Sequence, residues 1–268
     1  PYMIPMGNHA IPSHLKYSLD APTTRRNVQK LLRSMQLPKP ILLEGSPGTG
    51  KTTLLQAIAK ASGHEIVRIN LSEQTDMMDL LGTDLPVEGS SGGEFQWSDG
   101  IFLRALKAGD WILLDELNLA SQSVLEGLNS VLDHRAEIFI PELNRTFECP
   151  PTFRIFASQN PLQQGGGRKG LPKSFLNRFT QIYIEEFTPD DLLYIAKALY
   201  GEIGEENLKN MIEFNSQMHK KTMIEYKFGR KGAPWEFNLR DIFRWCELLK
   251  SDNVAPCDPA KYVDIIYR

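Results

Sequence analysis

Short apolar runs alternate with longer amphipathic segments through the first two thirds of the chain. Such runs are typical of strands buried on both faces of a parallel sheet, and the amphipathic segments between them are typical of covering helices. The alternation predicts an α/β fold with a five-stranded parallel sheet sandwiched by helices. The predicted strands are Ile41–Leu43, Ile66–Leu71, Trp111–Leu114, Phe153–Ala157 and Gln181–Ile184.

Helical periodicity marks the segments between these runs. In the first of them Val28, Leu31 and Met35 fall on one helical face, and Pro22 suits the first turn. A further short helix is predicted within Leu171–Phe179. The other helices predicted beside the sheet are Ala21–Gln36, Thr52–Ala61, Ile101–Ala108 and Ser121–His134.

Two insertions interrupt the alternation. Met77–Ser98 is broken by Pro86 and several glycines, so an irregular insertion loop or a hairpin is expected there. Glu137–Ile140 and Arg145–Cys149, separated by a short polar turn, predict a β-hairpin ahead of the fourth strand.

No strand pattern remains after Phe187, and the chain continues as helices. These are predicted at Thr188–Tyr200, Glu205–Lys220 and Asn238–Lys250. The sequence therefore predicts three parts: a linker over residues 1–20, a large α/β domain over 21–186 and a small C-terminal α-helical lid domain over 187–268.

A complete phosphate-binding motif of the form G-x-x-x-x-G-K-[ST] follows the first strand and opens the next helix. Its glycines allow backbone N–H groups to surround phosphates, and the helix N-terminus favours anions. Lys51 would reach the β- and γ-phosphates of ATP, and Thr52 would offer its hydroxyl to Mg²⁺. The predicted nucleotide-binding residues are Gly45, Ser46, Pro47, Gly48, Thr49, Gly50, Lys51, Thr52 and Thr53.

Two carboxylates end the third predicted strand, where ligands bind in parallel sheets. Asp115 would hold Mg²⁺, directly or through water, and Glu116 would orient and polarise the attacking water. The alternative for each is an ordinary surface carboxylate after a core strand. No Asn-Lys-x-Asp motif for reading guanine is present, which argues against a Ras-like GTPase.

Three further residues are candidates for catalysis. Asn160, at the end of the fourth strand, would contact the γ-phosphate or the attacking water, although Asn160-Pro161 is also a common turn signal. Arg178 would act in trans as an arginine finger on a neighbouring module, with Arg168 as the rival and a surface salt bridge as the alternative. Arg240, near the start of a lid helix, would bind over the nucleotide and couple its phosphate state to the angle between the two domains; the alternative is an ordinary arginine on the helix surface.

Composition adds limits. The net charge is −3 and the pI is about 6.0, which disfavours a dedicated nucleic-acid binder. No apolar run is long enough to cross a bilayer. The cysteines Cys149, Cys246 and Cys257 have no metal-site spacing. The chain begins without Met, so we expect it to be a piece of a longer protein.

In this order the motifs resemble those of the AAA+ class of P-loop NTPases. The resemblance is to the branch with a helix-2 insertion and a pre-sensor-1 β-hairpin, which includes the dynein-related, MoxR-like and minichromosome-maintenance ATPases. Within it the chain is most similar to the midasin family, the dynein-related ATPases of ribosome assembly. Segments that carry this similarity include Val67–Thr75 (VRINLSEQT), Asp115–Leu128 (DELNLASQSVLEGL), Gln159–Gly170 (QNPLQQGGGRKG) and Pro234–Cys246 (PWEFNLRDIFRWC).

The resemblance implies that this is one of six modules of a single polypeptide that closes into a ring. It implies a Mg²⁺-dependent ATPase whose partners are the neighbouring modules and the pre-60S ribosomal particle with its assembly factors. It implies nuclear localisation, in the nucleolus and nucleoplasm, and no membrane or sequence-specific nucleic-acid binding.

Two other functions remain open at this point. A structural module could bind ATP or ADP and only brace the ring, but it need not retain Glu116 or Asn160. A helicase-related nucleic-acid motor would need basic loops, whereas Met77–Ser98 carries four acidic residues and no Lys or Arg.

Overall fold

The computed structural model describes residues 2–12, 20–86, 95–133, 135–161, 170–229, 235 and 237–251. The chain divides into two compact units. Unit 1 comprises Pro1–Tyr17, Val28–Ser46 and Gly50–Ile184, and unit 2 comprises Ser18–Asn27, Pro47–Thr49 and Glu185–Arg268. Each unit is described by itself below.

A five-stranded sheet forms the centre of unit 1, in the order β2-β5-β8-β1-β9. Every neighbouring pair is parallel, which confirms the predicted fold class. The first strand in the chain, β1, lies between β8 and β9, so the phosphate loop leaves the sheet next to the end of β8. The strands are β1 (Ile41–Glu44), β2 (Ile66–Asn70), β5 (Trp111–Asp115), β8 (Arg154–Gln159) and β9 (Thr180–Tyr183).

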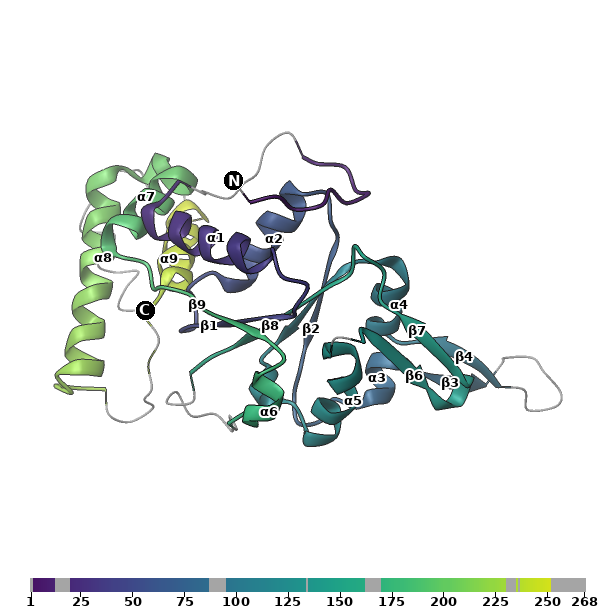
Figure 1. Ribbon diagram of the computed structural model, residues 1–268. Coiled ribbons are helices and arrows are strands. Elements are labelled where there is room, and N and C mark those ends of the chain that lie inside the picture. Colours follow the sequence, from purple (N-terminus) through teal and green to yellow (C-terminus); the bar gives the residue numbers. More distant parts are fainter. Residues whose placement is uncertain are drawn as a thin grey trace. The chain divides into compact units, whose positions relative to one another are not determined.

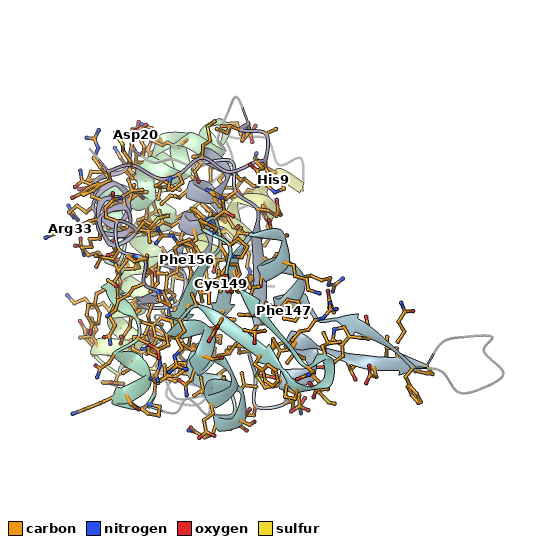
Figure 2. The ribbon with its side chains drawn as sticks, turned by 45° about the vertical axis from the view of Figure 1, so that its right-hand side comes forward. His9, Asp20, Arg33, Phe147, Cys149 and Phe156 are labelled. Atoms are coloured by element: carbon orange, nitrogen blue, oxygen red, sulfur yellow. The ribbon has the colours of Figure 1, made fainter. Side chains whose placement is uncertain are left out.

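Successive side chains of β5 enter two separate cores because neighbouring residues of a strand point to opposite faces. Trp111 and Leu113 pack on the face covered by helices α1 and α2, together with the fully buried Phe156 (Figures 1 and 2). Ile112 and Leu114 pack on the face covered by α3 to α6. The helices are α1 (Pro22–Ser34), α2 (Lys51–Ala61), α3 (Met77–Leu81), α4 (Ile101–Ala108), α5 (Gln122–Leu132) and α6 (Lys173–Leu176).

Two antiparallel hairpins extend this second face, β3 (Gly82–Pro86) with β4 (Phe95–Asp99) and β6 (Glu137–Ile140) with β7 (Arg145–Glu148) (Figure 1). The hairpin predicted as one alternative for Met77–Ser98 is therefore confirmed. The irregular structure predicted as the other alternative is wrong for the first residues of this segment, which form helix α3. There α3 forms because the side chains of Asp76 and Asp79 make a reciprocal capping box. Residues 87–94 lie outside the described part of the chain.

Part of the N-terminal segment that was predicted as a linker, residues 5–9, contacts the rest of unit 1. The backbone N–H groups of Gly7 and His9 donate to the carbonyls of Ser62 and Gly63, at 2.8 Å and 2.9 Å. His64 Nε2 lies 2.9 Å from the Pro5 carbonyl, and its ring stacks on Trp111. These contacts hold residues 5–9 against the end of α2.

Unit 2 is helical. Its core of apolar residues is contributed by α7 (Pro189–Tyr200), α8 (Glu205–His219) and α9 (Leu239–Ser251). A turn of π-helix, Lys220–Ile224, extends α8. The beginning of α1 also belongs to this unit, because the backbone N–H of Thr23 donates to Asp191 Oδ1 at 3.0 Å. No helix in the described ranges is both long and apolar enough to span a membrane.

Candidate functional site

The loop between β1 and α2 has the backbone of a phosphate-binding turn. Gly48 and Gly50 both have φ of 77°, in the left-handed region where a side chain would be strained. Gly50 precedes the first residue of α2, and among the described residues no side chain caps this helix and no acidic residue lies in its first turn. The first-turn N–H groups therefore suit an anion such as a phosphate.

Lys51 is the first residue of α2 and only 8% of its surface is exposed. Its amine donates to the carbonyls of Gly45 and Ser46, at 2.6 Å and 3.0 Å. It also donates to Asn160 Oδ1 at 2.9 Å. These acceptors hold the amine at the inner side of the loop, where it would meet the β- and γ-phosphates of a nucleotide.

Asn160 also contacts the predicted catalytic base. Its Nδ2 donates to Glu116 Oε1 at 2.5 Å, so one amide joins the lysine to the carboxylate. Glu116 has φ of 56°, which is rare for a residue other than glycine and is found preferentially at functional sites. The structure thus brings together Lys51, Asn160 and Glu116, three residues that the sequence predicted separately.

Asn118, in the single turn Leu117–Leu119 after β5, is a residue that the sequence analysis missed. It is 2% exposed, and its Nδ2 donates to the backbone carbonyl of Asn160 at 3.0 Å. This bond fixes the end of β8 against the segment that follows Glu116. In the sequence, only its position two residues after Glu116 indicated a place near the site. The structure is needed to show that its side chain is buried and contacts Asn160.

Asp115 uses both of its carboxylate oxygens within the protein. Its Oδ1 accepts a hydrogen bond from the Ser158 hydroxyl of β8, and its Oδ2 accepts from Arg68 of β2. Neither partner was predicted from the sequence. The contact with Ser158 could be predicted only from the strand order, because β8 is the neighbour of β5 and Ala157 is paired with Leu114.

The donor set suits a magnesium ion that is held mainly by phosphate oxygens. Mg²⁺ prefers oxygen ligands and is usually bound by one or two protein groups together with substrate phosphates. Asp115 is 8% exposed and the hydroxyl-bearing Thr52 is half-buried, whereas Thr53 is exposed. Across the described ranges no group of three or more His, Cys, Asp or Glu side chains forms a metal cage. Asp115 and Thr52 therefore fit the ion as its two protein ligands.

Arg178 follows α6 and is not brought together with these residues by any contact that the structure shows. Its Nη1 donates to the Ser174 carbonyl at 2.7 Å, one turn earlier. Its Nε is buried and has no hydrogen-bond partner among the described residues. The rival arginine, Arg168, lies outside the described residues.

Arg240 belongs to unit 2, as do Pro47, Gly48 and Thr49 of the phosphate loop. Its side chain is exposed in the first turn of α9, and its backbone N–H donates to Asn238 Oδ1 at 2.9 Å. Within the same unit, a Cβ added to Gly48 would lie 2.5 Å from Cγ of Asn238. Only glycine fits at this position of the loop.

Comparison with known proteins identifies the family of the chain. Residues 40–179 match the family model of the AAA domain, dynein-related subfamily, and residues 191–267 match the midasin AAA lid domain. Midasin of Dictyostelium discoideum is 63% identical over all of this chain, and Midasin of Giardia intestinalis is 49% identical over 91% of it. The chain spans only 4% and 5% of the lengths of these two relatives.

More distant proteins also match most of the chain. An uncharacterized protein of Staphylococcus aureus is 29% identical, with 88% of this chain and 86% of that protein covered. The crystal structure of a putative ATPase from Cytophaga hutchinsonii superposes with a TM-score of 0.53 at 20% identity, covering 76% of this chain and 66% of that one. Because the subfamily model matches more than half of its residues, the chain belongs to the dynein-related subfamily of AAA domains.

Proposed function

We propose that this AAA domain binds ATP with Mg²⁺ and hydrolyses it, as one catalytic module of a midasin-like ring. The observation that carries the proposal is the contact of Asn160 with both Lys51 and Glu116. A lysine that binds phosphate and a carboxylate that activates water must act on the same γ-phosphate. Their common amide partner supports that arrangement.

Each residue has a role that follows from its position. Lys51 binds the β- and γ-phosphates, and the N–H groups of the loop surround them. Asp115 and Thr52 would hold the ion, which would neutralise the charge that develops on the phosphates. The Glu116 carboxylate orients and polarises the attacking water, and Asn160 keeps that carboxylate in place.

Binding is tested with Lys51→Ala, with Lys60→Ala as the control on the exposed side of the same helix. Calorimetric titration with ATP and Mg²⁺ should show binding for the control and no heat for Lys51→Ala. Equal affinity of the two variants for ATP would contradict the assignment of the loop as the phosphate-binding site.

Hydrolysis is tested with Glu116→Gln, which removes the charge at nearly constant shape, in full-length protein whose other modules have lost their catalytic glutamates. We expect retained ATP binding and nearly complete loss of phosphate release. Hydrolysis by the variant at the rate of the unmutated protein would instead favour a structural module that only binds nucleotide.

The wider role is proposed from similarity to Midasin. In this proposal six modules close a ring in the nucleus, and ATP turnover removes assembly factors from pre-60S ribosomal particles. The test is to replace the native gene by one carrying Glu116→Gln and to follow pre-60S particles by sedimentation. Particles that retain assembly factors support the role. Normal maturation, or a helicase activity in its place, contradicts it.

A further inference from the structure

Arg68 supplies a positive charge to the carboxylate that we assign to the metal ion. Both Nε and Nη2 of Arg68 approach Asp115 Oδ2, at 2.8 Å and 2.5 Å. The other oxygen accepts from the Ser158 hydroxyl. Both oxygens of the Asp115 carboxylate therefore already accept hydrogen bonds from side chains of the protein.

The two partners differ in how freely they can move. Asp115 ends β5, an interior strand of the sheet, and its side chain is 11% exposed. Arg68 lies on β2, the outermost strand of the sheet on this side, and its side chain is 48% exposed. In the strand register Arg68 is paired with Leu113, so its side chain extends along the sheet to reach Asp115. The carboxylate is thus fixed, whereas the guanidinium can turn toward solvent.

Electrostatics explains why such a partner is present and what it does. A buried carboxylate without a counter-charge destabilises the folded state, so Asp115 requires a cation at all times. A guanidinium and a magnesium ion cannot share one carboxylate oxygen without repulsion between two positive charges. An ion that binds Oδ2 directly therefore requires Arg68 to release that oxygen.

We propose that Arg68 is the resident counter-cation of Asp115 and that it competes with the metal ion for this carboxylate. The inference rests on the proposed function, because it concerns the magnesium site of that same nucleotide pocket. Arg68 thereby lowers the affinity of the site for Mg²⁺, and it stabilises unit 1 when no ion is bound.

The test compares Arg68→Met, which removes the charge and keeps much of the length, with Arg68→Lys, which keeps the charge. Arg33→Met is the control, since Arg33 is exposed on α1 (Figure 2). Binding of a non-hydrolysable ATP analogue is measured over a range of Mg²⁺ concentrations and in EDTA. We expect half-saturation at about tenfold less Mg²⁺ for Arg68→Met, with the affinity in EDTA unchanged. Arg68→Lys and Arg33→Met should resemble the unmutated chain.

Thermal unfolding gives a second measurement that does not depend on hydrolysis. Without metal, Arg68→Met should melt below the control, and Mg²⁺ with the analogue should stabilise it by more than it stabilises the control. If Arg68→Met does not fold, Arg68→Gln replaces it in both measurements.

An unchanged or increased Mg²⁺ requirement in the charge-removing variant would overturn the competition and assign Arg68 to holding Asp115 for the ion. In a different outcome, the unmutated chain would bind the analogue with the same affinity with and without Mg²⁺. That outcome would overturn the magnesium site of the proposed function itself.

Discussion

Lys51 and Asn160 are separated by 109 positions in the chain, yet the lysine amine lies 2.9 Å from the asparagine side-chain oxygen. The other end of the same amide donates to Glu116. An amide is suited to this place because its oxygen faces a cation and its NH₂ group faces an anion. A carboxylate there would repel Glu116, and an aliphatic side chain would contact neither charge.

The first prediction concerns that amide. Asn160→Asp keeps the shape but places an acceptor against Glu116, so we expect the carboxylate to turn away from its position. In full-length protein in which only this module retains its catalytic glutamate, ATP hydrolysis should fall about 10²-fold, the loss typical of removing one oriented polar contact at a reacting centre. Steady-state phosphate release measures the effect, and calorimetry should show that ATP still binds. Unaltered hydrolysis would mean that Asn160 serves only the turn before Pro161.

A second prediction separates positioning from folding at Asn118. Asn118→Leu removes the hydrogen bond to the Asn160 carbonyl at nearly constant volume. The melting temperature should change little, because the buried Oδ1 of Asn118 has no partner among the described residues and its loss offsets the lost bond. Because Asn118 does not line the phosphate loop, kcat should fall about tenfold with KM almost unchanged. A raised KM at constant kcat would contradict the positioning role.

Much of the fold could be predicted from the sequence because its signals are local. A buried parallel strand such as β5 is a continuous apolar run, and the phosphate loop is a contiguous motif. The three residues Lys51, Glu116 and Asn160 could be named for the same reason, since each ends a strand or begins a helix. Their hydrogen bonds could not be predicted, because these depend on β8 lying between β5 and β1.

The residues that were missed act across strands. Arg68 resembles any charged residue on an edge strand until the register of β2 against β5 is known. The left-handed backbone of Glu116 has no local signal, since the surrounding structure imposes it.

The N-terminal segment, with several Pro, His and Gly residues, resembles a linker. Its docking depends on Gly63, which has φ of 71° at the end of α2.

The third prediction tests that docking. A Cβ on Gly7 would lie 2.0 Å from the Gly63 carbonyl oxygen, so Gly7→Ala must displace the segment. We expect a lower melting temperature and faster proteolysis of residues 2–12. Gly201→Ala is the matched control, because a Cβ there meets nothing within 4 Å among the described atoms. Equal melting of the two variants would show that the segment adds no stability.

The fourth prediction concerns pH and Asp191 in unit 2. Burial by itself raises the pKa of this carboxyl, but hydrogen bonds from Thr23 and Thr188 outweigh it and lower the pKa below its ordinary value of 3.8. A lowered pKa contributes stability that is present above the unfolded value and lost as pH falls through the folded value. Asp191→Asn should therefore cost roughly 2 kcal/mol at pH 7. Urea unfolding should show that this difference narrows below pH 3.8. A constant difference across pH would exclude the charge as its cause.

The last prediction concerns Arg178 and requires the whole ring. In the structure its guanidinium is held by the Ser174 carbonyl, and no contact joins it to Lys51 within the described part of unit 1. The contacts of Arg178 within the described residues therefore do not connect it to the phosphate loop of its own chain. If Arg178 serves the neighbouring module, the isolated chain binds ATP but hydrolyses it slowly, because positive charge is missing in the transition state.

In the full-length protein Arg178→Ala should slow hydrolysis by the adjacent module by about 10³-fold, while this module still binds ATP. Single-turnover measurements on proteins in which only one module retains its catalytic glutamate would identify which site is affected. Arg178→Lys should restore little, since a lysine lacks the planar fork that contacts two phosphate oxygens. An ordinary surface residue would behave differently. Its loss would leave the neighbour's rate unchanged and would cost this module at most about 1 kcal/mol of stability.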